Sequence, residues 1–154
     1  MPELDRTDFV LLDALQKNVR MANKELAAAV NLAPSTCHER VKRLWDAGVI
    51  KGAHAVVEPK AFGIGLEALL FIELSKHERG NVDGFMAEVA LIPEVRSAYL
   101  ITGRHDLVVH VVARDTLHLK DLALDRFTNR PGVTRIETSI IYEAVERHQL
   151  PQLR

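Results

Sequence analysis

The sequence predicts an α+β fold in which three short helices, in residues 1–60, precede a ferredoxin-like βαββαβ domain in residues 61–154. Up to about residue 50, apolar side chains recur three or four positions apart, which is helical spacing. From Ala68 onward they alternate with a period of two, which is typical of strands. The domain boundary is expected between Pro59 and Gly65, where the periodic pattern changes.

The first domain contains three apolar stripes, and each stripe predicts one helix. Their residues are Phe9, Leu12 and Leu15, then Leu26 and Val30, then Cys37, Val41 and Leu44. The ends of the helices are marked as well. Asn23 is expected to cap the second helix, Pro34 to lie in the first turn of the third, and Gly48 to follow its last turn.

The second domain is expected to contain strands at 68–75, 97–103, 106–113 and 135–143, with helices at 81–91 and 116–129. Two of these strands are apolar on both faces: Leu107, Val109 and Val111 alternate with Val108 and Val112, and Ala68, Leu70 and Ile72 alternate with Leu69 and Phe71. One face of the sheet can pack against the helices, but the other needs a second cover. The sheet of another copy is the expected cover, so the sequence predicts at least a homodimer.

The composition, with 47% hydrophobic and 27% charged residues, is that of a folded globular protein. No apolar run reaches the roughly 20 residues that cross a bilayer, and no basic and then apolar leader opens the chain, so we expect a cytoplasmic location without membrane attachment. Cys37 is the only cysteine, which excludes an internal disulfide and a thiolate metal cage. No cofactor is expected, because neither a Walker loop nor a dinucleotide fingerprint is present.

The charge of the chain is unevenly distributed, although its formal net charge is only -1. Seven basic side chains face three acidic ones between Lys17 and Lys51, whereas residues 61–154 carry 11 basic and 13 acidic side chains. A basic surface on an otherwise neutral protein is typical of a local contact with nucleic acid.

The basic segment also fits a helix-turn-helix, in which a first helix braces a second one that enters the major groove. Its parts are Lys24–Val30, a turn at 31–33, and Pro34–Asp46. The N-terminus of the last helix can bind a phosphate, and its basic residues can bind phosphates or guanine. The candidate DNA-binding residues are Lys24, Ser35, Thr36, His38, Glu39, Arg40, Lys42 and Arg43. Taken alone, such a charge run more often marks a solvated helix face.

Three sequence motifs make the DNA-binding interpretation more specific. They are Leu26–Thr36 (LAAAVNLAPST), His38–Leu44 (HERVKRL) and Gly48-Val49-Ile50. Together they resemble the leucine-responsive regulator/AsnC (feast/famine) family of transcription regulators, and the resemblance extends from Leu4 to about Glu143.

The resemblance implies a winged-type helix-turn-helix, a short hinge strand near His54 to Val57, and an effector domain whose sheets pair into dimers. It further implies that dimers commonly associate further, often into octamers, and that a small effector, an amino acid in such proteins, modulates DNA binding. Separately, an enzyme is not expected, because no nucleophile with a base, Walker loop or dinucleotide fingerprint is present. Ala33 departs from the pattern, because the family usually has Ser as the helix cap before Pro34. The missing hydroxyl should destabilise this helix end by about 1 kcal/mol.

A further motif, in the second domain, is Tyr99–Val108 (YLITGRHDLV). It is similar to the turn that helps to bind an amino acid between dimers in this family. Gly103 lets a ligand approach the backbone, neighbouring N–H groups can bind a carboxylate, and Asp106 can accept from an ammonium group. The candidate effector residues are Leu100, Thr102, Gly103, Arg104, His105, Asp106, Thr138, Ser139 and Ile140, those on the last strand through the resemblance alone. The alternative is a plain hairpin, which a glycine and an aspartate also favour.

Two other functions remain open at the level of sequence. Metal binding or catalysis could use His105, His110 and His118 near Asp106. His105 and His110 are expected on opposite faces of a strand by parity, however, and should not share an ion unless the loop folds back. Alternatively, the second domain could serve only to oligomerise and bind no small molecule.

Overall fold

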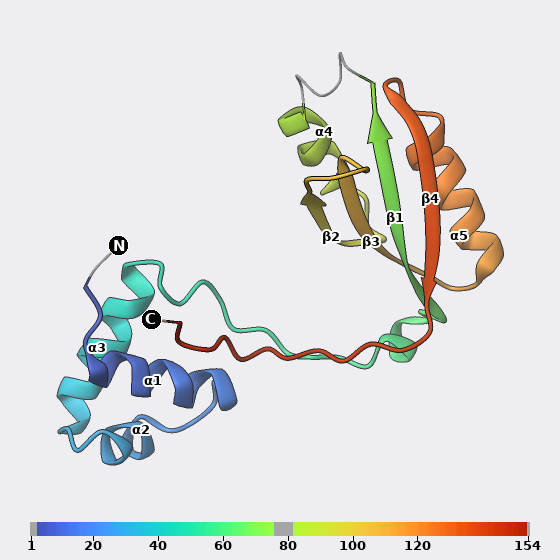
Figure 1. Ribbon diagram of the computed structural model, residues 1–154. Coiled ribbons are helices and arrows are strands. Elements are labelled where there is room, and N and C mark those ends of the chain that lie inside the picture. Colours follow the sequence, from blue (N-terminus) through green and yellow to red (C-terminus); the bar gives the residue numbers. More distant parts are fainter. Residues whose placement is uncertain (1–2, 76–81, 154) are drawn as a thin grey trace. The chain divides into compact units, whose positions relative to one another are not determined.

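The computed structural model describes residues 3–75 and 82–153, and the chain divides into two compact units (Figure 1). The helical unit comprises Met1–Val56 together with Val145–Arg154, and the sheet unit comprises Val57–Ala144. The C-terminal segment therefore groups with the helical unit, where the backbone N–H of Leu150 donates to Oε1 of Gln16 at 2.6 Å.

The helical unit contains α1 (Arg6–Lys17), α2 (Asn23–Ala29) and α3 (Pro34–Asp46). Asn31 takes a left-handed conformation, with φ of 54°, in the turn between α2 and α3. Pro34 opens α3, and Gly48 follows its end with φ of 67°, a conformation that glycine adopts without strain. The predicted helix-turn-helix and these two helix ends are confirmed.

The core of the helical unit is formed by Leu11, Leu26, Ala27 and Cys37, each at most 3% exposed. The stripe predicted for α1 was partly wrong: Leu15 packs against this core, but Leu11 is fully buried while Phe9 and Leu12 are only partly buried. Asp8, three residues before Leu11, is also fully buried. Apolar periodicity could not predict a buried aspartate on this side of the helix.

The predicted cap of the second helix was also wrong. Ala22 is the N-cap of α2, and the side chain of Glu25 accepts from its backbone N–H at 3.2 Å. Asn23 is the first helical residue, and its Nδ2 donates to the carbonyl of Pro34 at 2.7 Å. Asn23 therefore ties the start of α2 to the start of α3 instead of capping its own helix.

The hinge strand expected near His54 to Val57 is not formed in the single chain. Residues 51–58 contain no strand, and Val56 is 81% exposed. A strand requires a hydrogen-bonding neighbour. Within the described residues of one chain, this segment has no such neighbour.

The sheet unit begins with a 3-10 turn, Pro59–Phe62, and contains strands β1 (Leu66–Leu74), β2 (Val95–Leu100), β3 (Leu107–Ala113) and β4 (Val133–Ile141). Its helices are α4 (Val82–Val89) and α5 (Thr116–Ala123). The strand order is β2-β3-β1-β4, and all neighbours are antiparallel (Figure 1). This arrangement confirms the predicted ferredoxin-like βαββαβ fold.

Some predicted boundaries shift by a few residues. The strand expected at 97–103 runs from Val95 to Leu100, and the helix expected at 116–129 is α5 continued by a π-helical turn, Leu124–Thr128. The helix expected from residue 81 is described from Val82, since residue 81 lies outside the described residues. None of the described helices could cross a membrane.

The two faces of the sheet differ in burial. Ala68, Leu70 and Ile72 of β1 and Leu107, Val109 and Val111 of β3 are fully buried in the core with side chains of α4, α5 and the π-helical turn. The opposite face presents side chains that are mostly partly buried or exposed, and we call it the open face. Its apolar members are Leu69, Phe71, Tyr99, Val108 and Val112, of which Val112 is 9% and Tyr99 55% exposed.

Candidate functional site

The outward surface of α3 is polar and accessible. Ser35, Thr36, His38, Glu39 and Lys42 are exposed, and Lys24 of α2 is exposed as well. Cys37 and Leu44, on the opposite side of α3, are fully buried. The helix therefore presents to solvent most of the side chains that the sequence selected as DNA-binding candidates.

Arg40 and Arg43 behave differently, because both reach carboxylates of α1. Nη1 of Arg40 lies 2.7 Å from Oδ2 of Asp5 and 3.1 Å from Oδ1 of Asp8. Nη2 of Arg43 lies 2.6 Å from Oδ2 of Asp8. Asp5 and Asp8 also form the capping box of α1, in which each side chain accepts the other's backbone N–H. We call these four residues the Asp–Arg cluster.

The electrostatics of the Asp–Arg cluster follow from these contacts. The backbone N–H of Asp8 and the guanidinium of Arg40 lower the pKa of Asp5 below its ordinary value. The two carboxylates in turn raise the pKa of Arg40. Asp5 and Arg40 thus stabilise each other's charged forms.

The sequence analysis did not single out Asp5 and Asp8. A signal was present, because aspartates three residues apart at the start of an apolar helix are typical of a capping box. No pattern in the sequence indicated that arginines of α3, more than thirty residues away along the chain, would reach the same carboxylates.

The turn between β2 and β3 is held by the backbone and by Asp106. Gly103 has φ of 120°, and the N–H of Ile101 donates to the carbonyl of Asp106 at 3.0 Å. Oδ2 of Asp106 accepts from the backbone N–H of Leu74 at 2.8 Å. At least one oxygen of Asp106 therefore ties this turn to the end of β1.

Arg104 and His105 fold from this turn onto the open face. The rings of His105 and Phe71 have centroids 5.3 Å apart, and Nε2 of His105 lies 3.6 Å from Glu137 and 3.9 Å from Glu73. Arg104 reaches the same two carboxylates, at 3.2 and 3.8 Å. These residues form a charged border beside the apolar part of the open face.

The remaining effector candidates do not come together in one chain. Leu100 ends β2, whereas Thr138, Ser139 and Ile140 lie on β4, and β2 and β4 are the opposite edges of the sheet. Leu100 is 60% exposed and Ile140 38%. Leu100 and this group of β4 residues therefore lie apart in one chain, although Arg104 and His105 of the turn reach Glu137 of β4.

The histidines proposed for a metal site each have separate partners. Nε2 of His110 lies 2.6 Å from Glu67, and Nδ1 of His118 accepts from the backbone N–H of Arg114 at 3.2 Å. His105 is the exception that the parity argument allowed, because β3 begins only at Leu107 and the turn folds His105 back onto the face that also carries His110. In residues 3–75 and 82–153, no group of three or more metal-ligating side chains is present.

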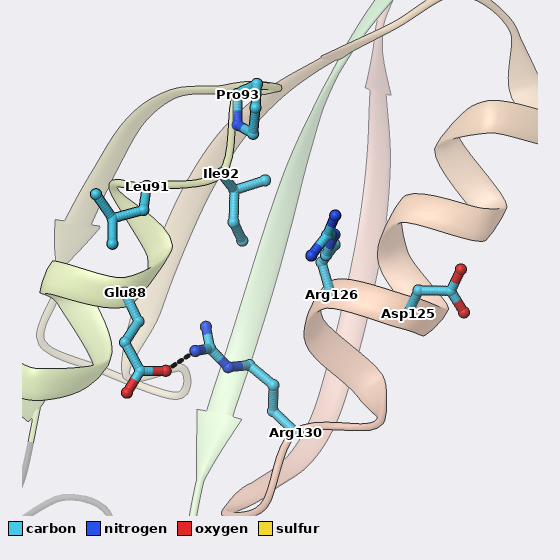
Figure 2. Close-up of a pocket in the computed structure, with 7 residues that line it drawn as sticks. All are labelled: Glu88, Leu91, Ile92, Pro93, Asp125, Arg126 and Arg130. Carbon is cyan, nitrogen blue, oxygen red and sulfur yellow. Dashed lines mark hydrogen bonds and ion pairs between the residues drawn. The ribbon is translucent and has the colours of Figure 1, made fainter.

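A groove of about 330 Å³ lies between the end of α4 and the π-helical turn, and Figure 2 shows the side chains that line it. Arg130 hydrogen-bonds to Glu88 across it, and its guanidinium lies 4.9 Å from the ring centroid of Phe85. The other lining residues are Leu91, Ile92, Pro93, Asp125 and Arg126. Its lining shares no residue with the β2–β3 turn.

Comparison with known proteins gives consistent matches for both parts of the chain. Residues 4–51 match a family model described as winged helix-turn-helix DNA-binding, and residues 67–151 match one described as Lrp/AsnC ligand binding domain. The transcriptional regulator AldR of Mycolicibacterium smegmatis is 38% identical over 141 residues, which cover 92% of this chain and 82% of that protein.

Two solved structures show the same fold. One is the complex of the transcriptional regulator NMB0573 from Neisseria meningitidis with L-Met, with a TM-score of 0.86, 32% identity and coverage of 94% of each chain. The other is AsnC from E. coli, with a TM-score of 0.86, 28% identity and coverage of 95% of this chain and 97% of that one.

Proposed function

The chain belongs to the Lrp/AsnC family of helix-turn-helix transcription regulators, and from this premise we propose that α3 contacts operator DNA and that an amino acid regulates the binding. The observation that carries the proposal is the polar outer surface of α3, which stands on a helix-turn-helix packed through Cys37 and Leu44. The proposed DNA contacts are Lys24, Ser35, Thr36, His38, Glu39, Lys42 and Arg43.

Each part of this surface has a distinct chemical role. Ser35 and Thr36, at the start of α3, can donate to a phosphate together with the helix N-terminus. Lys24 and Lys42 provide positive charge without a carboxylate partner in the described part of the chain, which suits phosphate contacts. His38 and Glu39 can reach base edges in the major groove. Arg40 is assigned to structure instead, because its guanidinium is directed to Asp5 and Asp8.

The proposed effector is a free amino acid that binds at the turn containing Thr102, Gly103, Arg104 and His105. Three observations support it: the match to a ligand-binding domain, the L-Met bound to the similar Neisseria protein, and the open backbone at Gly103. Because Leu100 and the group Thr138, Ser139 and Ile140 lie on opposite sheet edges, the proposed site is completed by a second subunit.

We propose a homodimer that forms through the open face and assembles further to an octamer. The support for the dimer is the partly buried apolar side chains of β1 and β3 on that face, and the incomplete effector site supports the further assembly. Binding of the amino acid between dimers would then change the spacing of the α3 helices. The proposal includes residues 1–60 as the DNA-binding domain with its hinge, residues 61–154 as the sensing and oligomerisation domain, and a cytoplasmic location.

The experiment is a gel shift with the purified chain on the DNA upstream of its own gene, with each of the twenty amino acids added in turn. A saturable shift that survives competitor DNA and changes with one amino acid is expected. A shift that no amino acid changes would remove the effector part and leave an oligomerisation module. No specific shift under any condition would contradict the regulator proposal as a whole.

A further inference from the structure

The carboxylate of Asp8 connects the first helix to the helix that carries the proposed DNA-binding surface. Its side chain is 0% exposed, and two arginines of α3 form ion pairs with it. Arg40 and Arg43 are three residues apart, so they lie close together on one side of the helix. A buried carboxylate is stable only when it is paired and hydrogen-bonded, and this requirement fixes the positions of both guanidinium groups.

The two arginines use their donors differently. Arg40 directs Nη1 to both Asp5 and Asp8, and its side chain is only 27% exposed. Arg43 gives Nη2 to Asp8 while its side chain remains 50% exposed. Nε and Nη1 of Arg43 make no hydrogen bond to any residue that the structure describes. Nη2 of Arg43 is therefore bound within the protein, whereas Nε and Nη1 remain available to solvent.

We propose that Asp8 is a positioning residue for DNA recognition, which holds Arg43 so that its remaining donors face a guanine edge or a phosphate beside α3. This inference rests on the proposed function. An arginine side chain loses much rotamer freedom when it binds, and an arginine that is already held by a carboxylate loses less. A donor of the held guanidinium can reach an acceptor of guanine only in a defined orientation.

The charges of the Asp–Arg cluster separate this role from simple attraction to DNA. Asp5 and Asp8 balance Arg40 and Arg43, so the cluster as a whole is neutral. It adds little to sequence-independent attraction, which depends on net positive charge near the phosphates. Its contribution is geometric, and the positioning of Arg43 acts on sequence discrimination.

The test compares Asp8→Asn with Asp13→Asn in the full-length chain. A DNA duplex is first selected from a random library with the unmodified chain, and the affinities for this duplex and for a scrambled one are then measured by fluorescence anisotropy at several salt concentrations. Asp13→Asn is the matched control, because it removes the same charge from α1 at an exposed site that pairs with Lys17 at 2.6 Å.

Asp8→Asn is expected to lower the ratio of selected to scrambled affinity about tenfold. Its affinity for the scrambled duplex should stay equal or increase, because a negative charge is lost. Asp13→Asn should leave the ratio unchanged. A ratio that is unchanged in Asp8→Asn, or a selected and a scrambled affinity that fall together in a folded variant, would overturn the inference.

A second pair of variants decides the question even if Asp8→Asn fails to fold. Arg43→Lys should lower the ratio, whereas Arg40→Lys should lower the melting temperature and leave the ratio intact; the reverse result would overturn the inference. In a folded double variant, Asp8→Asn with Arg43→Lys should discriminate no worse than Arg43→Lys alone. If the unmodified chain selects no sequence at all, the proposed function fails first, and this outcome is distinct from a selected duplex that Asp8→Asn still recognises.

Discussion

At the scale of single residues, the structure separates basic side chains that the sequence could only group together. Lys42 is exposed and has no carboxylate partner within the described residues, whereas Arg40 is held between Asp5 and Asp8. The same positive charge thus occurs in two environments. Lys42, which we propose as a phosphate contact, faces solvent, and Arg40 joins α3 to carboxylates at the start of α1.

Lys42→Ala tests the phosphate role directly. Its affinity for DNA should fall similarly for all sequences, and the slope of log affinity against log salt should decrease by about 1, because one fewer counterion is released. Anisotropy titrations at a series of salt concentrations measure this slope. Lys17→Ala, which removes an exposed lysine paired with Asp13 on α1, should leave the slope as it is.

Asp106 has a structural role that limits how its proposed effector role can be tested. Because Oδ2 of Asp106 accepts from the N–H of Leu74, Asp106→Ala should lower the free energy of unfolding by about 1–3 kcal/mol. Asp106→Asn keeps an oxygen acceptor and should lose less stability, while its response to the amino acid weakens. Urea denaturation measures the first effect, and gel shifts with the effector measure the second. Equal stability of the Ala variant and the unmodified chain would contradict the structural role.

At the scale of elements, the start of α3 lacks a side-chain cap. Ala33 occupies the N-cap position with φ of -64° and ψ of 144°, a conformation that serine also adopts, and it makes no side-chain hydrogen bond. The departure from the family pattern that the sequence revealed at this position is therefore a real gap in the helix end.

Ala33→Ser should raise the free energy of unfolding of the helical unit by about 1 kcal/mol, because the hydroxyl can accept a backbone N–H of the first turn. Chemical denaturation followed by circular dichroism measures the change. The comparison is the unmodified chain, in which Ala33 offers no side-chain acceptor. A serine variant no more stable than the unmodified chain would show that the cap is satisfied in another way.

At the scale of the whole molecule, the open face and the separated effector candidates indicate that one chain is an incomplete unit. Leu69, Phe71 and Val108 are partly buried on a face that none of the described helices packs against, and Leu100 and the group Thr138, Ser139 and Ile140 lie on opposite edges of the sheet. Both features are explained if subunits pack together.

Val108→Lys places a charge in the middle of the open face, opposite Phe71 on β1 and Tyr99 on β2. The single sheet should tolerate it, because Val108 does not belong to the core, but a sheet-to-sheet dimer should dissociate. Light scattering should show a smaller particle. The control is Leu117→Lys, which places the same charge on α5 at a site already 62% exposed. A dimer that persists in the Val108 variant would contradict packing through this face.

The sequence by itself determined the order of the elements, the fold class and the family. Helical and strand periodicities are local properties of the chain, and Pro34, Gly48 and Gly103 mark helix ends and a turn through their own backbone preferences. The motifs around α3 and the β2–β3 turn are each continuous in sequence, so the family resemblance could be recognised without knowing which parts of the chain come into contact. The outer surface of α3 was predicted for the same reason, because a helix distributes its side chains regularly around its axis.

Only the tertiary structure decided which residues meet across long stretches of the chain. It brought Arg40 and Arg43 to Asp8, buried Leu11 in place of the predicted stripe on α1, and placed His105 beside Phe71. The physical reason is that such contacts depend on the packing of elements that are distant in sequence, and a buried charge or a folded turn leaves no periodic pattern. The sequence indicated which side chains were available, and the packing determined their partners.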